Sequence, residues 1–152
     1  MVLFRKEGTR SFLMNLTNIR FSSINPKDHN VFLQDICQAY DGGYLAELET
    51  KDESDYLETL AKQTGKDFWL GGKDEVEGHW KWVTSGKNFT FTDWHPGEPN
   101  DSHHDEDCLH LYGPHGYHWN DGSCNRLQNY ICEAGFKIAG PLIPDIGSAG
   151  KK

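Results

Sequence analysis

The sequence Trp-His-Pro-Gly-Glu-Pro-Asn at residues 94–100 is followed by Glu106-Asp107-Cys108 and then by Trp119-Asn120-Asp121. A proline stands between two oxygen-bearing side chains, and a second such pair follows a tryptophan. The carboxylates and carboxamides of these motifs form one candidate ligand set: Glu98, Asn100, Glu106, Asn120 and Asp121. Calcium takes about six to eight oxygen ligands, whereas zinc and copper favour nitrogen or sulfur. The pattern therefore predicts a calcium site rather than a catalytic pair of carboxylates.

Further short motifs stand on both sides of this region. Gly42-Gly43-Tyr44-Leu45-Ala46 and Trp69-Leu70-Gly71-Gly72 precede it, and Tyr130-Ile131-Cys132-Glu133 follows it. Together, and in this order, the motifs make the chain resemble a C-type lectin domain from Ile24 to Ala134. The resemblance implies an α+β fold, with two helices packed on short antiparallel sheets and a long loop region ordered by calcium.

The resemblance also divides the chain. Residues 1–23 are expected to form an N-terminal strand segment, residues 24–134 the carbohydrate-recognition domain, and residues 135–152 a flexible tail. The tail is rich in glycine and proline, which is typical of flexible segments. Longer members of the family carry an additional cysteine pair in an N-terminal hairpin. This chain has no cysteine there, so it resembles the short form.

Local patterns indicate where the helices and strands lie. Asn25-Pro26 reads as the start of a first helix, because proline suits the first helical position. Thr50 and Glu53 form a capping-box pattern for a second helix, which is expected to end near Gly65. Short strands are expected at residues 68–70, 79–83, 108–112, 117–119 and 128–133. Between them, residues 84–107 are polar and without periodicity, and loops of that length are usually functional or disordered.

Composition excludes several classes of function. The chain has 152 residues, which is the size of one domain, and a formal net charge of −8. No basic cluster is present to displace the counterions of a nucleic acid, and anionic membrane surfaces are excluded on the same ground. No apolar stretch approaches the roughly 20 residues that a membrane-spanning helix requires.

The four cysteines are Cys37, Cys108, Cys124 and Cys132. An even number favours two disulfides and an oxidising compartment, while zinc binding is disfavoured because no close Cys-x-x-Cys pair exists. The sequence alone leaves about three pairings open; the resemblance implies Cys37–Cys132 and Cys108–Cys124. Residues 1–8 are too short in apolar residues for a signal peptide, so a leader has been removed or the sequence is incomplete. We infer secretion to the extracellular space from the cysteines and the resemblance.

Carried over residue by residue, the resemblance implies two calcium sites. The principal calcium would be held by Glu98, Asn100, Glu106, Asn120 and Asp121. Pro99 would follow a cis peptide bond, and Trp119 would pack beneath the calcium loop and position its two neighbours. An auxiliary calcium would be held by Asp74, Glu77, Asp101, Glu106 and Asp107.

In the family, vicinal hydroxyls of a sugar complete the coordination of the principal calcium. The order Glu-Pro-Asn accompanies mannose, fucose, glucose and N-acetylglucosamine, and the order Gln-Pro-Asp accompanies galactose. The resemblance therefore implies a lectin for mannose-type sugars on cell surfaces or glycoproteins, including microbial surfaces. Single-site affinity is weak in such lectins, so a homo-oligomer is expected for avidity.

Three alternatives compete with this hypothesis. The chain could be a galactose-specific lectin, or a calcium-stabilised module that binds a protein or a mineral. An enzyme is disfavoured, because Glu98 and Glu106 cluster with carboxamides rather than standing as an acid and a base of different pKa. No paired nucleophile and histidine is legible either.

Histidines, tryptophans and sequons have simpler interpretations. His103, His104, His115 and His118 could bind zinc, line the sugar pocket or lie on the surface, and nothing in the sequence fixes their geometry. Trp69, Trp80, Trp82 and Trp94 are expected in the core rather than stacked on a sugar. Asn15 and Asn88 begin glycosylation sequons, as does Asn100, which is expected to stay unmodified because it is a predicted ligand.

Overall fold

The computed structural model describes residues 2–6, 9–14, 29–39 and 42–135. The predicted helix start at Asn25-Pro26, the sequon at Asn15 and the tail beyond residue 135 lie outside the described residues. Within them, no helix is both long and apolar enough to cross a membrane.

The strands form one connected sheet in the order β1-β2-β8-β4-β6-β7, with β3 paired to β8 and β5 paired to β4. All pairs are antiparallel except β4 with β8. The strands are β1 (Val2–Lys6), β2 (Thr9–Met14), β3 (Tyr44–Leu45), β4 (Phe68–Lys73), β5 (Lys81–Trp82), β6 (Cys108–Leu111), β7 (Trp119–Gly122) and β8 (Asn129–Gly135).

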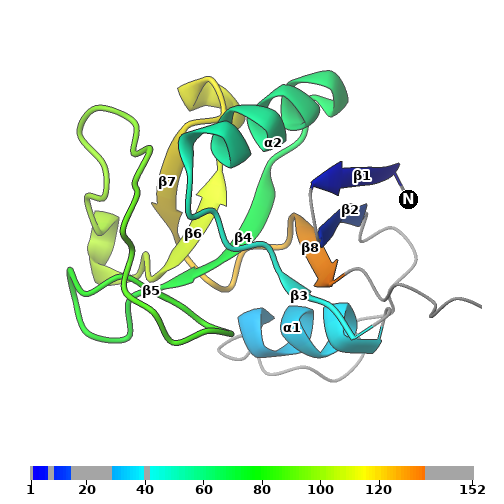
Figure 1. The fold of residues 1–152 in the computed structure, drawn as a ribbon. Helices are drawn as coiled ribbons and strands as arrows, with labels where there is room; N and C mark the ends of the chain where they lie inside the picture. The colour runs from blue at the N-terminus through cyan, green and yellow to red at the C-terminus, as the bar shows by residue number, and fades with distance from the viewer. Residues whose placement is uncertain (1, 7–8, 15–28, 40–41, 136–152) are drawn as a thin grey trace, which may run out of the picture.

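Two helices pack against this sheet, α1 (His29–Ala39) and α2 (Lys51–Thr64). In Figure 1 they lie on opposite sides of the central strands, and the green loops that follow β5 project away from the β1–β2 hairpin. The Thr50 hydroxyl accepts from the Glu53 amide, and the Glu53 carboxylate accepts from the Thr50 amide. Gly65 ends the helix in the left-handed region with φ 66°. The capping prediction for the second helix is therefore confirmed.

Both disulfides are those implied by the resemblance. Cys37–Cys132 joins α1 to β8 across 95 residues, and Cys108–Cys124 joins the start of β6 to the segment after β7 across 16 residues. On loop-closure entropy, bonds of these spans stabilise the fold by about 4.5 and 3 kcal/mol.

An aromatic core supports the loop region. Trp69, Trp82 and Trp119 are almost fully buried, and Trp80 is 8% exposed. The Phe89 ring lies 4.2 Å from Trp82 and 5.4 Å from Trp119, centroid to centroid. Trp94 is partly buried against the same cluster. The predicted core role of the tryptophans is confirmed, and the long loop shares its aromatic core with β5 and β7.

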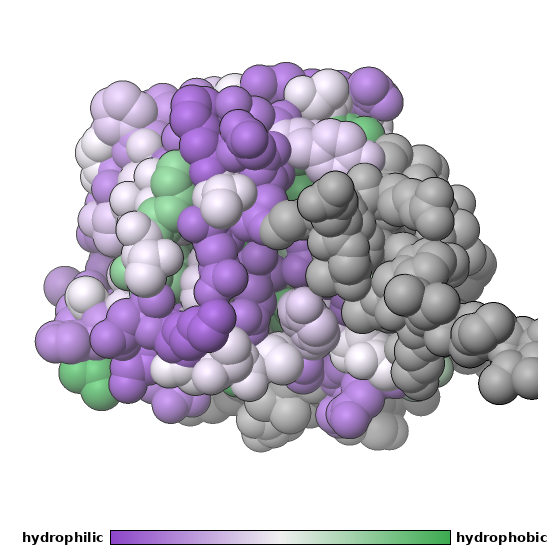
Figure 2. All heavy atoms as spheres, in the orientation of Figure 1, coloured by the Kyte–Doolittle hydropathy of each residue, from purple (hydrophilic) through white to green (hydrophobic). Residues whose placement is uncertain are grey.

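Two strands differ from the prediction. The strand expected at residues 79–83 is reduced to Lys81–Trp82, because the Gly86 amide donates to the Trp82 carbonyl and turns the chain. The strand expected at 117–119 begins only at Trp119, because Tyr117 has φ 71°, which no strand accommodates. The face drawn in Figure 2 is mostly polar, with small separate apolar areas.

Candidate functional site

The start of β7 holds the loop that carries Glu-Pro-Asn. The Trp119 amide donates to the Asp93 carbonyl at 3.0 Å, and the His95 amide donates to the Trp119 carbonyl at 2.9 Å. Trp94 and Trp119 thus form an isolated parallel bridge. Because Asn120 and Asp121 follow directly, this bridge brings the two predicted halves of the ligand set to the same end of the sheet.

Three of the predicted principal ligands are in contact. The Asn100 side-chain amide donates to Glu98 Oε2 at 2.5 Å. Asp121 Oδ2 accepts from the backbone amides of Asn100 at 2.9 Å and Asp101 at 2.7 Å. The Glu98–Pro99 peptide bond is cis. Asp121 is therefore the buried acceptor around which the Glu-Pro-Asn loop folds.

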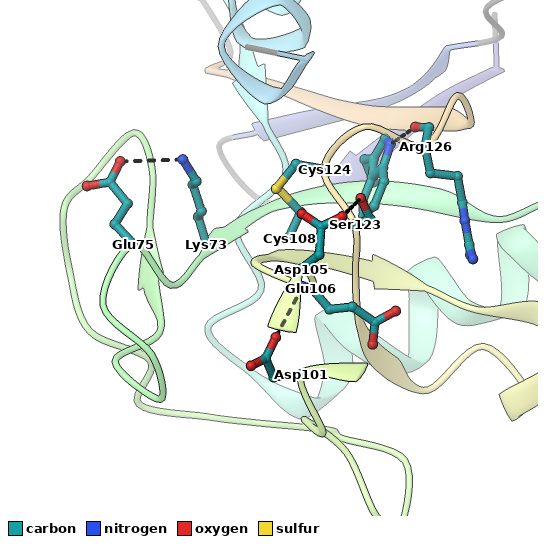
Figure 3. Close-up of a disulfide and its surroundings, with 10 residues drawn as sticks. Lys73, Glu75, Asp101, Asp105, Glu106, Cys108, Ser123, Cys124 and Arg126 are labelled. Carbon is teal, nitrogen blue, oxygen red and sulfur yellow. Dashed lines mark hydrogen bonds and ion pairs between the residues drawn. A yellow bond between two sulfur atoms is a disulfide. The ribbon is translucent and has the colours of Figure 1, made fainter. Parts of the chain in front are cut away.

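Glu106 belongs to the next loop. Its Oε2 accepts from the Ser102 amide at 3.1 Å, across the short 3-10 helix η3 (Ser102–His104). The Glu106 amide donates in turn to Asp101 Oδ1 at 3.3 Å, as Figure 3 shows. The same view shows Ser123 bonded to Asp105 beside the Cys108–Cys124 disulfide. The disulfide therefore holds the segment that carries Glu106 against the segment after β7.

Charge accumulates where these loops meet. Burial raises the pKa of Glu98 to about 7, and the neighbouring Asp121 and Glu106 carboxylates raise it further. Burial also raises the pKa of Glu106. Asp121 Oδ1 is buried without a hydrogen-bond partner. An all-oxygen set with unbalanced negative charge and a free buried oxygen fits a hard divalent cation.

Asn120 has a second set of partners. Its side-chain amide contacts His110 Nε2 at 3.1 Å and donates to the Asp121 carbonyl. His110 lies in β6 and is fully buried, and burial lowers the pKa of its ring to about 3. A neutral ring can accept at Nε2, so His110 fixes the orientation of the Asn120 amide.

The predicted auxiliary ligands are only partly assembled. Asp74 is 3% exposed, and its Oδ2 accepts from the Gly78 amide at 3.0 Å while Oδ1 has no partner. Burial raises its pKa to about 6, and Glu77 and Asp107 add to the shift. Asp101 instead pairs with His104 Nδ1 at 2.9 Å, which lowers the pKa of the Asp101 carboxyl. Glu77 is exposed.

Tight clusters of potential metal ligands among the described residues are two: His95 with Glu98 and His115, and Glu58 with Asp93 and His118. In each, one ligand atom per residue lies within 4.8 Å of the others. The carboxylates predicted for calcium form no such group of three in the described part of the chain. They are bonded instead to backbone amides and to the Asn100 side chain.

Sequence reasoning missed His95 as a neighbour of Glu98. The His95 and His115 rings stack with centroids 4.0 Å apart, and His115 Nδ1 lies 3.8 Å from Glu98 Oε1. The only available signal was the place of His95 inside the motif at 94–100. His115 comes from the short 3-10 helix η4 (Gly113–His115), which no pattern predicts to lie there.

Comparison with known proteins places the chain among lectins. The family model for the lectin C-type domain matches residues 33–134. A perlucin-like protein of Mytilus galloprovincialis is 34% identical over 122 residues, which cover 76% of each chain. Perlucin of Haliotis laevigata is 36% identical over 94 residues, covering 59% of this chain and 60% of that protein.

Solved structures share the fold at lower identity. The herring type II antifreeze protein matches with a TM-score of 0.72 and 24% identity, over 89% of this chain and 97% of that chain. The cow CD23 carbohydrate-recognition domain, solved in the presence of a GlcNAc2Man3 oligosaccharide, matches with a TM-score of 0.70 and 21% identity, over 89% and 94%. Because the family model covers more than half of the residues, the chain belongs to the C-type lectin domain family, whose members are non-enzymatic recognition domains.

Proposed function

We propose that the protein is a calcium-dependent lectin for terminal mannose-type sugars, namely mannose, fucose, glucose and N-acetylglucosamine. Glu98, Asn100, Glu106, Asn120 and Asp121 would hold the principal calcium. The observation that carries the proposal is the junction of Glu98, Asn100 and Asp121, where a buried aspartate with one free oxygen meets a glutamate of raised pKa.

A cation at this junction would offset the cost of the clustered carboxylates. It would supply positive charge and open coordination positions for two vicinal sugar hydroxyls. In the protein, the Asn100 amide and the Glu98 carboxylate stand side by side as donor and acceptor. A hydroxyl could accept from the first and donate to the second, and such charge-assisted bonds give selectivity as well as strength.

The choice of sugar rests on the order of these two groups. Glu98 precedes the cis proline and Asn100 follows it, so the acceptor and donor occupy fixed sides of the site. This is the order that accompanies mannose-type ligands in the family. Exchanging the two functions, as in Glu98→Gln with Asn100→Asp, is expected to shift preference toward galactose.

A second calcium, secretion and self-association complete the proposal. Asp74, Glu77, Asp101, Glu106 and Asp107 would hold the auxiliary ion, with Asp74 as its buried anchor. Two disulfides suit an extracellular protein. A homo-oligomer would raise avidity for glycans on cell surfaces or glycoproteins, including microbial ones. Asn88 is exposed and is the glycosylation candidate within the described residues.

The test is retention on mannose-agarose in millimolar calcium, with elution by EDTA and, separately, by free mannose or galactose. Wild-type protein should be retained and released by EDTA and mannose. Glu98→Gln should flow through, whereas the matched control Glu75→Gln should behave as wild type, because the Glu75 side chain is 80% exposed and bonded only to Lys73 among its printed partners.

Two results would contradict the proposal. Release by galactose but not mannose would assign the other sugar class. Absence of retention by correctly folded, calcium-loaded protein would favour the alternative, a calcium-stabilised module for a protein or a mineral. The fold does not decide between these, since an antifreeze protein and a sugar-binding domain share it.

A further inference from the structure

A second cluster of metal-ligand side chains lies at the base of the long loop and shares no residue with the proposed calcium sites. It consists of Glu58 from α2, Asp93 from the loop and His118 from the residue before β7. His118 Nδ1 lies 3.2 Å from Asp93 Oδ2 and 3.6 Å from Glu58 Oε1. We propose that these three side chains form a binding site for a divalent ion of the zinc type.

The separations suit such an ion. Zinc bonds histidine nitrogen and carboxylate oxygen at about 2.0–2.2 Å in a tetrahedron, which places neighbouring ligand atoms about 3.4 Å apart. The two measured separations from His118 bracket that value. The mixed nitrogen and oxygen set favours zinc over calcium, which takes oxygen alone. Water would occupy the fourth position, because the His118 side chain is 44% exposed and opens the cluster to solvent.

Burial of Glu58 is the independent observation that points to a ligand. The residue is 5% exposed, and its Oε1, which faces His118, is buried without a hydrogen-bond partner. The other oxygen, Oε2, is paired with Lys62 Nζ at 3.2 Å. Lys62 therefore neutralises one side of the carboxylate and leaves the free oxygen directed into the cluster. A buried acceptor without a partner is costly, and a bound cation would satisfy it.

Supporting contacts hold the ligands in place. Ser54, one turn before Glu58 on α2, donates to Asp93 Oδ2 at 3.2 Å and accepts from Trp119 Nε1 at 3.0 Å. The Trp119 amide also donates to the Asp93 carbonyl. Hydrogen bonds of this kind to a ligating carboxylate fix its orientation and raise metal affinity. The three ligands thus come from separate segments that the same tryptophan ties together.

Binding is tested by titrating Zn²⁺ into the protein in millimolar calcium, which occupies the oxygen-only sites, by calorimetry and by competition with a chromogenic chelator. Wild-type protein should bind one ion at this cluster and melt at a higher temperature with zinc than without it. His118→Ala should weaken zinc binding at least tenfold and abolish the zinc-dependent rise in melting temperature. His118 is partly exposed, so its removal should leave the fold intact.

Matched variants separate this cluster from the other histidines. His104→Ala removes a side chain that is 93% exposed, and His115→Ala removes a member of the His95–Glu98–His115 cluster. Both should keep the affinity and the melting shift that His118→Ala loses. Zinc binding that survives His118→Ala, or that His115→Ala abolishes, would overturn the proposal, as would no binding by the wild type. The last result would mean that the three side chains form only an ion-paired structural contact.

Discussion

The hydroxyl of Ser54 offers the most direct test of how α2 supports the loop region. It is fully buried, accepts from the indole Nε1 of Trp119 at 3.0 Å and donates to Asp93 Oδ2 at 3.2 Å. Ser54→Ala removes both bonds with almost no change in volume. The indole N–H would then be buried without an acceptor, since Trp119 is 0% exposed.

The magnitude follows from these two losses. A buried donor left without its partner costs about 1–3 kcal/mol, and a hydrogen bond to a charged group contributes about 1.5–3 kcal/mol. Asp93 keeps His118 as a partner, so the second term is only partly lost. We expect Ser54→Ala to lower the free energy of unfolding by about 2–4 kcal/mol. For a domain of this size, that corresponds to a melting temperature lower by about 6–12 °C.

Urea and thermal unfolding followed by circular dichroism in calcium would measure the difference. Ser123→Ala is the matched control, because its hydroxyl donates to an exposed Asp105 carboxylate at 2.9 Å. It should change stability by less than about 0.5 kcal/mol. A Ser54→Ala variant within that same margin of the wild type would refute the view that the Trp119–Ser54–Asp93 chain stabilises the fold.

Three further predictions follow from other parts of the structure. Calcium affinity should fall by about 50-fold between pH 7 and pH 5, because Glu98 with a pKa of about 7 goes from about half to about 1% deprotonated and calcium must displace its proton; calorimetry at both pH values would show it, and constant affinity would contradict it. Calcium-free protein should show the opposite trend, with stability falling as pH rises from about 4.5 to 7, since the native state keeps the Glu98 proton longer than the unfolded chain; a urea midpoint that rises over this range would argue against it. Gly72→Ala should destabilise the fold by about 1–3 kcal/mol in urea unfolding, because its Cβ would lie 2.6 Å from Phe89 and 2.8 Å from Leu109, and an unchanged midpoint would mean that these side chains move aside freely.

Local patterns predicted the parts of the fold that depend on neighbouring residues. The second helix begins at Lys51 and ends at Thr64, because Thr50, Glu53 and Gly65 determine its ends through bonds within a few residues. The disulfide pairing required the resemblance, because the cysteines alone allow three pairings. The parallel pairing of β4 with β8 had no local signal, since it joins segments about 60 residues apart in the sequence.

The candidate site divides in the same way. Glu98, Asn100 and Asp121 stand in short motifs, and the structure brings them into contact. The extent of β7 was mispredicted because the left-handed φ of Tyr117 depends on the preceding 3-10 turn rather than on side-chain periodicity. The Glu58–Asp93–His118 cluster left no sequence signal, because each residue lies in a different segment and only the packing of α2 on the loop brings them together.

Trp119 links the two polar regions of the molecule. Its backbone amide and carbonyl hold the loop at Asp93 and His95, and its indole is bonded to α2 through Ser54. Asn120 and Asp121 follow it in β7, and Asp121 accepts the amides that shape the Glu-Pro-Asn loop. A change at Asp93 or Ser54 therefore acts on the same tryptophan that positions the proposed calcium ligands. An ion bound by Glu58, Asp93 and His118 would restrain that tryptophan from the side of α2, and should favour the loop arrangement that calcium requires.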